Sequence, residues 1–501
     1  MRKLVILSAT LIGLSCSKKI DHCSMVDRTA DIFPDYVDVV IPPNIAPLNF
    51  HINNKGTAFR VEFYTEKDKG FAIDQSSGDI IIPEHHWHEL IRSNQGRNLF
   101  IDIYIKNDGW VKYKTIKDSI VSEKVESYLA YRLINTSNIM WHEMGIYQRN
   151  IENYTETPIF RNRSSENGCV NCHHFNQSDP ERMTLHFRKS FPGTLLLIQD
   201  SLVKLDTKTP YTMSSFAFAA WHPGGDYLAY CVNLVHQVFT STIDYHHVVY
   251  DDASDLVIYD IQRNRVTTSP RVSSQNRENM PSFSPDGKWI YYISCPPQTN
   301  DSNRTFAKYD LVRVPLDIET NTWGEVDTLI TSHETGKSIS FPKVSPDGKY
   351  VMFSMGNYGY FTIFDKDADL YIYDIEKLSY RKLESNSEYA ESYPDWSQTS
   401  HWFAFESRRM DNLYTRIYYS YFDEDGKAHR PFVLPQKDPL YYKKLMQNYN
   451  LPELINDKVS VDEIALRNFI PKDPIQVRFD TTIDIDALSG ATYLHQIENY
   501  K

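Results

Sequence analysis

The stretch FSPDGKWIYY at residues 283–292 decides the fold of this 501-residue chain. Its Ser-Pro-Asp-Gly-Lys centre predicts a tight turn, because proline presets φ and glycine tolerates the positive φ that such turns need. The aromatic and β-branched residues that follow predict a strand. Three other segments share this template, although the last has lost the Pro-Asp-Gly turn: WHPGGDYLAY at 221–230, VSPDGKYVMF at 344–353 and WSQTSHWFAF at 396–405.

A second pair of strands follows most copies of the template, for example at residues 255–260 and 369–374. Four strands per repeat is the pattern of a β-propeller blade. The Ser-Pro-Asp-Gly-Lys core resembles the repeat of TolB-like propellers over about residues 210–435, which implies an all-β fold. Upstream, residues 126–160 match a fifth blade and residues 193–205 supply part of a sixth. We therefore expect a propeller over residues 123–435, with six blades favoured and seven as the alternative.

The segments on either side of the propeller have different patterns. Residues 36–122 alternate apolar and polar side chains between turn signals, which predicts a small antiparallel β-sandwich. Within it, the histidine-rich run at residues 85–88 is interpreted as a solvated helix start rather than a metal site. Residues 16–35 are polar and predict a tether, and residues 436–501 form a C-terminal extension with a helical pattern at 442–449.

The first residues of the chain predict export. A basic start and a short apolar run end at Leu14-Ser15-Cys16, which resembles a bacterial lipoprotein signal over residues 1–15, with Gly13 as a departure. The resemblance implies a lipid on Cys16 and attachment to a membrane outside the cytoplasm. Residues 17–19 are not acidic, which favours a periplasm-facing protein over a surface-exposed one. A simple secretory signal, with Cys16 incidental, is the alternative.

The sequence contains one Cys-x-x-Cys-His pattern, formed by Cys169, Cys172 and His173. The two thiols can bond to the vinyl groups of one porphyrin, and the adjacent imidazole can bind its iron, so the pattern predicts attachment of haem c. A zinc half-site and a thioredoxin-type pair are weaker interpretations, because neither a second ligand pair nor a βαβ setting is present. We expect the motif in a haem-binding loop at about residues 161–192, between two blades.

Several residues near the motif could complete a haem site. His186 is our first choice for the sixth iron ligand, with Met183 and Met144 as alternatives. Arg188 and Arg161 could pair with haem propionates. Cys231 and Cys295, which end apolar runs in the repeats, are expected to be buried thiols.

The end of the chain carries a second pattern, DALSGAT at residues 486–492. It resembles the flavinylation motif Asp-x-x-Ser/Thr-Gly/Ser-Ala-Thr. The resemblance implies that FMN is linked through its phosphate to the hydroxyl of Thr492. The departure is that no complete flavin-binding domain surrounds the motif.

These patterns together favour one function. A net charge of −12 argues against nucleic acid. Haem c, FMN and the export signal all agree with an exported, lipid-anchored electron-transfer protein whose partners are redox proteins of the cell envelope. We expect a redox carrier more than a substrate-converting enzyme. A propeller-bearing hydrolase is disfavoured, since no Gly-x-Ser-x-Gly nucleophile motif is present. The alternative is a non-catalytic TolB-like propeller that acts as a protein-interaction or ligand-binding module at the envelope.

Overall fold

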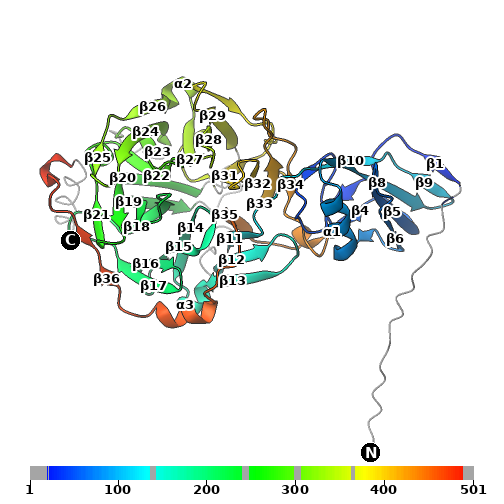
Figure 1. Cartoon of the computed structure of the whole chain (residues 1–501), viewed down its shortest axis with the longest axis horizontal. Helices are drawn as coiled ribbons and strands as arrows, with labels where there is room; N and C mark the ends of the chain where they lie inside the picture. The colour runs from blue at the N-terminus through cyan, green and yellow to red at the C-terminus, as the bar shows by residue number, and fades with distance from the viewer. Residues whose placement is uncertain are drawn as a thin grey trace, which may run out of the picture.

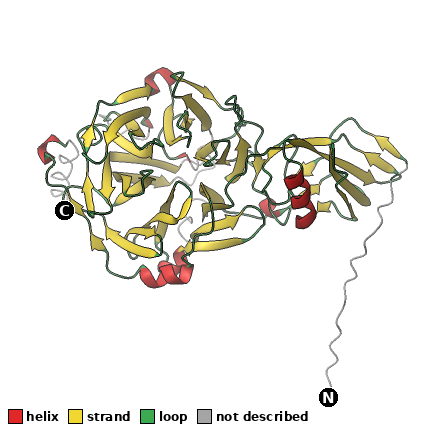
Figure 2. Ribbon diagram, in the orientation of Figure 1, coloured by secondary structure: helices red, strands yellow, loops and turns green. Residues whose placement is uncertain are grey.

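The computed structural model describes residues 20, 22–135, 143–239, 247–297, 306–362 and 367–488. A ring of antiparallel sheets makes up most of the protein, and a smaller domain lies at its side (Figure 1). Strands dominate both parts, and the few helices lie at the periphery (Figure 2). None of the helices in these ranges is long and apolar enough to cross a membrane. The expected all-β propeller is therefore confirmed.

Among the described residues, six sheets form the ring, and we name them blades 1 to 6 in chain order. From the centre outward, the strands of blades 1 to 3 are β35 (Asn448–Ile455), β11 (Tyr128–Ile134), β12 (Met144–Asn150) and β13 (Glu156–Arg161); β14 (Cys169–Asn176), β15 (Asp179–Arg188), β16 (Gly193–Ile198) and β17 (Ser201–Asp206); and β18 (Phe216–Trp221), β19 (Tyr227–Phe239), β20 (His247–Asp260) and β21 (Arg265–Thr267).

Blades 4 to 6 repeat this order and contain the three later copies of the sequence template. Their strands are β22 (Arg277–Phe283), β23 (Trp289–Cys295), β24 (Asp310–Asp317), β25 (Thr322–Trp323) and β26 (Asp327–Ile330); β27 (Ser338–Val344), β28 (Tyr350–Gly356), β29 (Asp369–Asp374) and β30 (Ser379–Lys382); and β31 (Glu391–Trp396), β32 (Trp402–Ser407), β33 (Arg416–Tyr421) and β34 (Phe432–Val433). In blade 4, β25 and β26 both pair with β24. The template turns connect the first and second strands of each of these blades.

Blade 1 is built from both ends of the propeller sequence. Its inner strand β35 comes from the C-terminal segment and pairs antiparallel with β11, with Leu129 opposite Leu454. The expected boundary at residue 435 is therefore wrong, because the next residues still belong to the ring. The expected helix at 442–449 is also wrong: a short 3-10 turn, η5 (Tyr441–Lys443), leads directly into β35. β35 supplies the inner edge that the three strands β11 to β13 otherwise lack.

The inner strands share a bulge. In β18, β22, β27 and β31 the register with the second strand slips by one residue, and in β35 it slips against β11. One non-glycine residue at each bulge has a positive φ between 46° and 52°: Phe218, Met280, Phe341, Tyr393 and Leu451. Such a backbone conformation is uncommon for large side chains and indicates a constraint from the surrounding fold. Neighbouring inner strands contact one another around the centre of the ring, where these residues lie.

The N-terminal domain has two sheets and one helix. Its larger sheet contains β1 (Cys23–Met25), β3 (Val40–Ile41), β5 (Ala58–Thr65), β6 (Phe71–Gln75), β8 (Arg97–Lys106), β9 (Trp110–Lys112) and β10 (Ile116–Ile120), and its smaller sheet contains β2 (Ile32–Phe33), β4 (Phe50–Ile52) and β7 (Asp79–Ile80). The tether expected at 16–35 is wrong in part, since β1 and β2 belong to these sheets. The histidine-rich run begins α1 (Glu84–Ser93), as expected, and Trp87 of that helix is fully buried.

The two domains share one hydrophobic core, which continues from the N-terminal sheets into blades 1, 5 and 6. Polar contacts lie along the same boundary. The indole of Trp402 donates to the Glu123 carbonyl at 2.8 Å, and the Asn49 amide donates to the Lys437 carbonyl at 3.1 Å. The N-terminal domain is therefore packed onto the propeller rather than loosely attached to it.

The chain after β35 runs along the outside of the ring. Helix α3 (Glu463–Phe469) packs near β13, and β36 (Ile475–Gln476) and β37 (Arg478–Phe479) pair in parallel with β17 and β21. The remaining short helices are η2 (Asn162–Ser165), α2 (Ser332–Thr335) and η6 (Ile485–Ala487). This segment thus covers the outer edges of blades 2 and 3 (Figure 1).

Closure of blade 1 is testable by substitution in β35. Tyr449 is fully buried, and its ring contacts Tyr131 of β11 with centroids 5.0 Å apart. We expect Tyr449→Ala to lower the free energy of unfolding by about 3–5 kcal/mol, the usual cost of removing a large buried aromatic side chain. Urea unfolding measures this loss, and Met446→Ala, at a side chain that is 74% exposed, is the matched control. Equal stabilities of the two variants would contradict the role of β35.

Candidate functional site

The Cys-x-x-Cys-His motif lies in the innermost strand of blade 2. Residues 169–176 form β14, which pairs with β15, so the haem-binding loop expected at 161–192 is wrong. The two strands are joined by a tight turn at Gln177 and Ser178, both with positive φ. Blade 2 needs an inner strand, and this segment fills that place although it lacks the Pro-Asp-Gly turn of the later repeats.

The motif coincides with the bulge of its strand. The register of β14 slips between Asn171 and His174, so Cys172 and His173 occupy the place at which the other inner strands also slip. Proline follows the positive-φ residue in four of those strands, and alanine follows it in the fifth: Pro281, Pro342, Pro394, Pro452 and Ala219. His173 is therefore a histidine at a position that otherwise holds a small or rigid residue at the centre of the ring.

The surroundings of His173 suit an uncharged imidazole. The side chain is 2% exposed, and neither ring nitrogen makes a hydrogen bond of ordinary geometry in the described structure. Burial, the largest cause, and the nearby Arg132 guanidinium together lower the pKa of His173 to about 3, while a contact with the Leu451 backbone opposes this shift. A buried polar group without a partner is costly, so such a group needs an explanation. A metal ion on one nitrogen is one such explanation.

The first cysteine of the motif is also buried. Cys169 is 4% exposed, and the amide of Asn171 donates to its sulfur at 3.4 Å. The backbone N–H of Val170 donates to the sulfur of Met144 at 3.4 Å, so Met144 lies directly beside the motif. The side chain of Cys172 lies outside the described part of the structure.

The three expected sixth ligands lie in different places. His186 in β15 is directly opposite Asn171, and its Nδ1 lies 3.2 Å from the Thr194 hydroxyl. Its pKa is lowered to about 3, mainly by burial. Met183 lies three residues earlier on the opposite face of β15, in the core between blades 1 and 2. The fold therefore brings His186 and Met144 toward the motif and directs Met183 away from it.

The other predicted site residues are distributed widely. Arg161 forms an ion pair with Glu463 of α3 at 2.6 Å, while Arg188 lies opposite Cys169 in β15. Cys231 and Cys295 are buried, and each sulfur donates to a backbone carbonyl, as expected for thiols. Cys16, Thr492 and the side chain of Asp486 lie outside the described residues.

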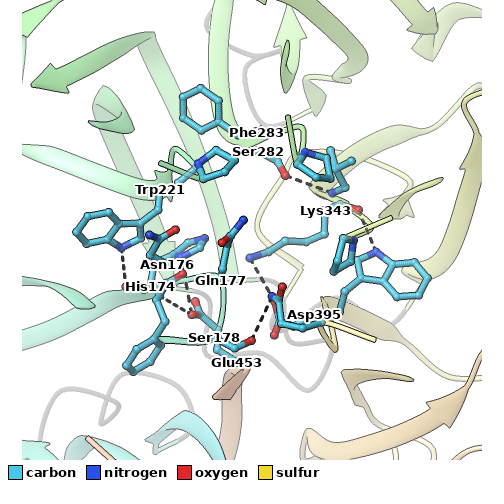
Figure 3. Close-up of a pocket in the computed structure, with 18 of the residues that line it drawn as sticks. His174, Asn176, Gln177, Ser178, Trp221, Ser282, Phe283, Lys343, Asp395 and Glu453 are labelled. Atoms are coloured by element: carbon cyan, nitrogen blue, oxygen red, sulfur yellow. Dashed lines mark hydrogen bonds and ion pairs between the residues drawn. The ribbon is translucent and has the colours of Figure 1, made fainter. Parts of the chain in front are cut away.

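A pocket of about 150 Å³ lies at one end of the ring's centre, next to the motif. We call it the mouth pocket (Figure 3). Each of the six inner strands contributes the residue that follows the proline or its equivalent at the bulge. These six residues are His174, Ala220, Ser282, Lys343, Asp395 and Glu453. A sequence signal was present, because each of the last four residues follows a tripeptide of serine or asparagine, a large apolar or aromatic residue, and proline. Only closure of the ring brings these residues together.

Two carboxylates, a lysine and a histidine face one another in the mouth pocket (Figure 3). The Nζ of Lys343 lies 3.6 Å from Asp395, and the Nδ1 of His174 lies 3.9 Å from Glu453. Backbone N–H groups hold both carboxylates: Phe175 donates to Glu453 at 3.0 Å and Leu454 donates to Asp395 at 2.9 Å. Burial raises the pKa of Asp395 and of Glu453, and Lys343 opposes both shifts.

A second group of polar side chains lies on the surface of α1. Ligand atoms of His85, His86 and Glu89 lie within 4.8 Å of one another, and all three side chains are exposed. Nothing buried supports this cluster, so the interpretation of a solvated helix start stands as the simpler account.

Comparison with known proteins finds similarity to solved structures only, at low sequence identity. No family model matches this chain. No curated protein matches it either. Solved structures similar to it include a puromycin-hydrolyzing peptidase of Mycobacterium tuberculosis (11% identity, TM-score 0.36, 68% of this chain and 51% of that one), the Dos1 propeller (13%, 0.33, 55% and 66%) and the β-propeller domain of the trilobed protease from Pyrococcus furiosus (12%, 0.34, 68% and 90%). The chain thus matches about half the length of the peptidase.

The acids near the bulges make stability depend on pH. Glu406 is fully buried, accepts from the N–H of Leu451 at 2.7 Å, and has a pKa raised to about 8 by burial. The folded state keeps Glu406 protonated up to about pH 8, whereas the unfolded chain ionises it above its ordinary pKa of 4.5, so stability falls as pH rises through this interval.

We therefore expect the free energy of unfolding to fall between about pH 5 and pH 8 in the wild type, and to fall less in Glu406→Gln. The two decreases should differ by more than about 1 kcal/mol. Urea titrations at both pH values measure the difference. The exposed Glu424→Gln serves as the control. A pH dependence in Glu406→Gln equal to that of the wild type would show that Glu406 is ionised in the folded protein.

Proposed function

We propose that this protein is an exported, lipid-anchored electron-transfer protein that carries haem c on β14. The observation that carries the proposal is His173, a buried imidazole without a hydrogen-bond partner of ordinary geometry in the described structure, four residues after the buried Cys169. The neutral form of His173 is the form that binds iron. A haem at this position would be held by residues of a rigid inner strand rather than by a mobile loop.

The residues available fit such a group. Cys169 and Cys172 would form the two thioether bonds, and His173 would bind the iron from one side. When bound, haem supplies one-electron transfer at a potential set by its ligands and by burial. The chain's own contribution would be to exclude water, through burial of Cys169 and His173, with Met144 and His186 beside the motif as candidates for a further ligand. A Met ligand would raise the potential relative to a His ligand.

The other parts of the proposal rest on sequence patterns. FMN on Thr492 would give a second redox centre, which can accept two electrons and release them singly. A lipid on Cys16 would attach the protein to a membrane, facing the periplasm, where redox proteins of the cell envelope would be its partners. Haem c attachment and flavin transfer both take place outside the cytoplasm, which agrees with the export signal.

A second function is supported by a different observation. The mouth pocket gathers charged and polar side chains at the centre of the ring, which is where a propeller that acts as a binding module would hold a ligand. This alternative needs neither haem nor FMN, and the two functions are compatible in one protein.

Haem attachment is tested by producing the full chain in a bacterium that matures c-type cytochromes. We expect a Soret band that remains with the polypeptide after denaturation, because thioether bonds survive unfolding. The double variant Cys169→Ala/Cys172→Ala should lose the band while circular dichroism still reports a folded β protein. Cys231→Ala, at a buried thiol away from the motif, should keep it. A denaturation-resistant band in the double variant, or none in the wild type, contradicts the proposal.

Flavin attachment is tested by co-production with an FMN transferase. Intact mass should increase by one FMN group in the wild type and remain unchanged in Thr492→Val, because only the hydroxyl at that position fits the motif. Thr481→Val, at an exposed threonine outside the motif, should keep the added mass. An unmodified wild-type protein would remove FMN from the proposal and leave the haem unaffected.

A further inference from the structure

The mouth pocket has a chemical character of its own. We propose that it binds a neutral polyhydroxylated small molecule about the size of one monosaccharide ring. The site is built from residues that the proposed haem does not use, so an experiment can contradict either proposal without affecting the other.

The mouth pocket contains both hydrogen-bond donors and hydrogen-bond acceptors. Lys343 offers an ammonium donor whose distance of 3.6 Å to Asp395 is longer than a hydrogen bond. Figure 3 shows this side chain extending across the pocket toward Asp395 and Glu453. Each carboxylate uses one oxygen to accept a backbone N–H, and the other oxygen of Asp395 lies 3.6 Å from the Lys343 ammonium, too far for a hydrogen bond. Donors and acceptors thus alternate around a small space, which is the arrangement that several hydroxyl groups on one molecule require.

Asn176 brings a buried amide oxygen to the mouth pocket. Asn176 at the end of β14 lines the pocket and is 7% exposed, and its Oδ1 makes no hydrogen bond within the described structure. A buried amide oxygen in this state costs free energy unless water or a ligand donates to it. A hydroxyl group of the ligand would supply that donor.

The charged side chains of the mouth pocket largely balance one another. Lys343 contributes one positive charge, and burial disfavours full ionisation of the two carboxylates. The pocket is therefore close to neutral overall. Lys343 would repel a cationic ligand, and Asp395 would repel an anionic one. A neutral ligand avoids both repulsions.

Aromatic side chains form the apolar part of the pocket lining. Trp221, Phe283 and Trp396 also line the pocket. The indole N–H groups of the two tryptophans donate to the carbonyls of His174 and Lys343, at 3.1 and 3.2 Å, which fixes both rings. Rigid aromatic surfaces beside a set of polar groups suit a molecule with an apolar ring face and a hydroxylated edge. A volume of about 150 Å³ limits that molecule to roughly one ring.

The test is a binding titration of the full chain, followed by calorimetry. The probes are five neutral compounds, namely glucose, galactose, mannose, arabinose and myo-inositol, and two charged counterparts, glucosamine and glucuronate. We expect saturable binding of at least one neutral probe, and weaker binding of both charged probes. No binding of any neutral probe, or tighter binding of a charged one, overturns the proposal. This comparison uses the wild type and does not depend on how variants fold.

Variants locate the site. Lys343→Met and Asn176→Leu should each weaken binding of the neutral probe by about tenfold or more, because each removes a hydrogen bond that the ligand makes away from bulk water. Lys349→Met, at an exposed lysine of the same blade outside the pocket, should leave the affinity unchanged. Unchanged affinity in both pocket variants would mean that the probe binds elsewhere, and the proposal would be wrong.

Discussion

The pairing of β35 with β11 is the interaction on which the rest of the structure depends. It joins residues that lie more than three hundred positions apart, and it completes blade 1 with a strand from beyond the last blade. Consecutive inner strands then contact one another around the ring, from β14 through β18, β22, β27 and β31 to β35, and β35 returns to β14. The N–H of Phe175 donates to Glu453 across this last junction, so closure also builds the mouth pocket. A ring closed in this way covers the inner strand edges that would otherwise be open.

The repeated bulge explains why two unlike features lie side by side. Each inner strand changes direction at one residue of positive φ or its equivalent, and the residue two positions later faces the mouth pocket. In β14 this local geometry coincides with the motif: Cys172 and His173 fall in the bulge, and His174 falls in the pocket. The proposed haem ligand and the proposed binding pocket therefore occupy consecutive residues of one strand.

Sequence reasoning succeeded where the information is local. Ser-Pro-Asp-Gly-Lys turns are short-range signals, so the templates predicted blades 4 and 5. The match of residues 126–160 to a blade likewise predicted two strands of blade 1, β11 and β12. It failed where the partner is distant. CVNCHHFN has no Pro-Asp-Gly turn after it, and its role as an inner strand depends on β15 and β35. The strands β1 and β2, of three and two residues, are too short to show any periodicity. The mouth pocket exists only once six separate segments meet.

The central claim is that an inner propeller strand carries covalent haem. Peptide mapping of the matured protein tests it most directly, since trypsin cleavage after Arg163 and Arg182 yields one peptide, residues 164–182, that contains both cysteines of the motif. The account predicts that mass spectrometry finds this peptide with one haem added and with no thiol available for alkylation. The same peptide without haem, alkylated at both Cys169 and Cys172, would contradict the account.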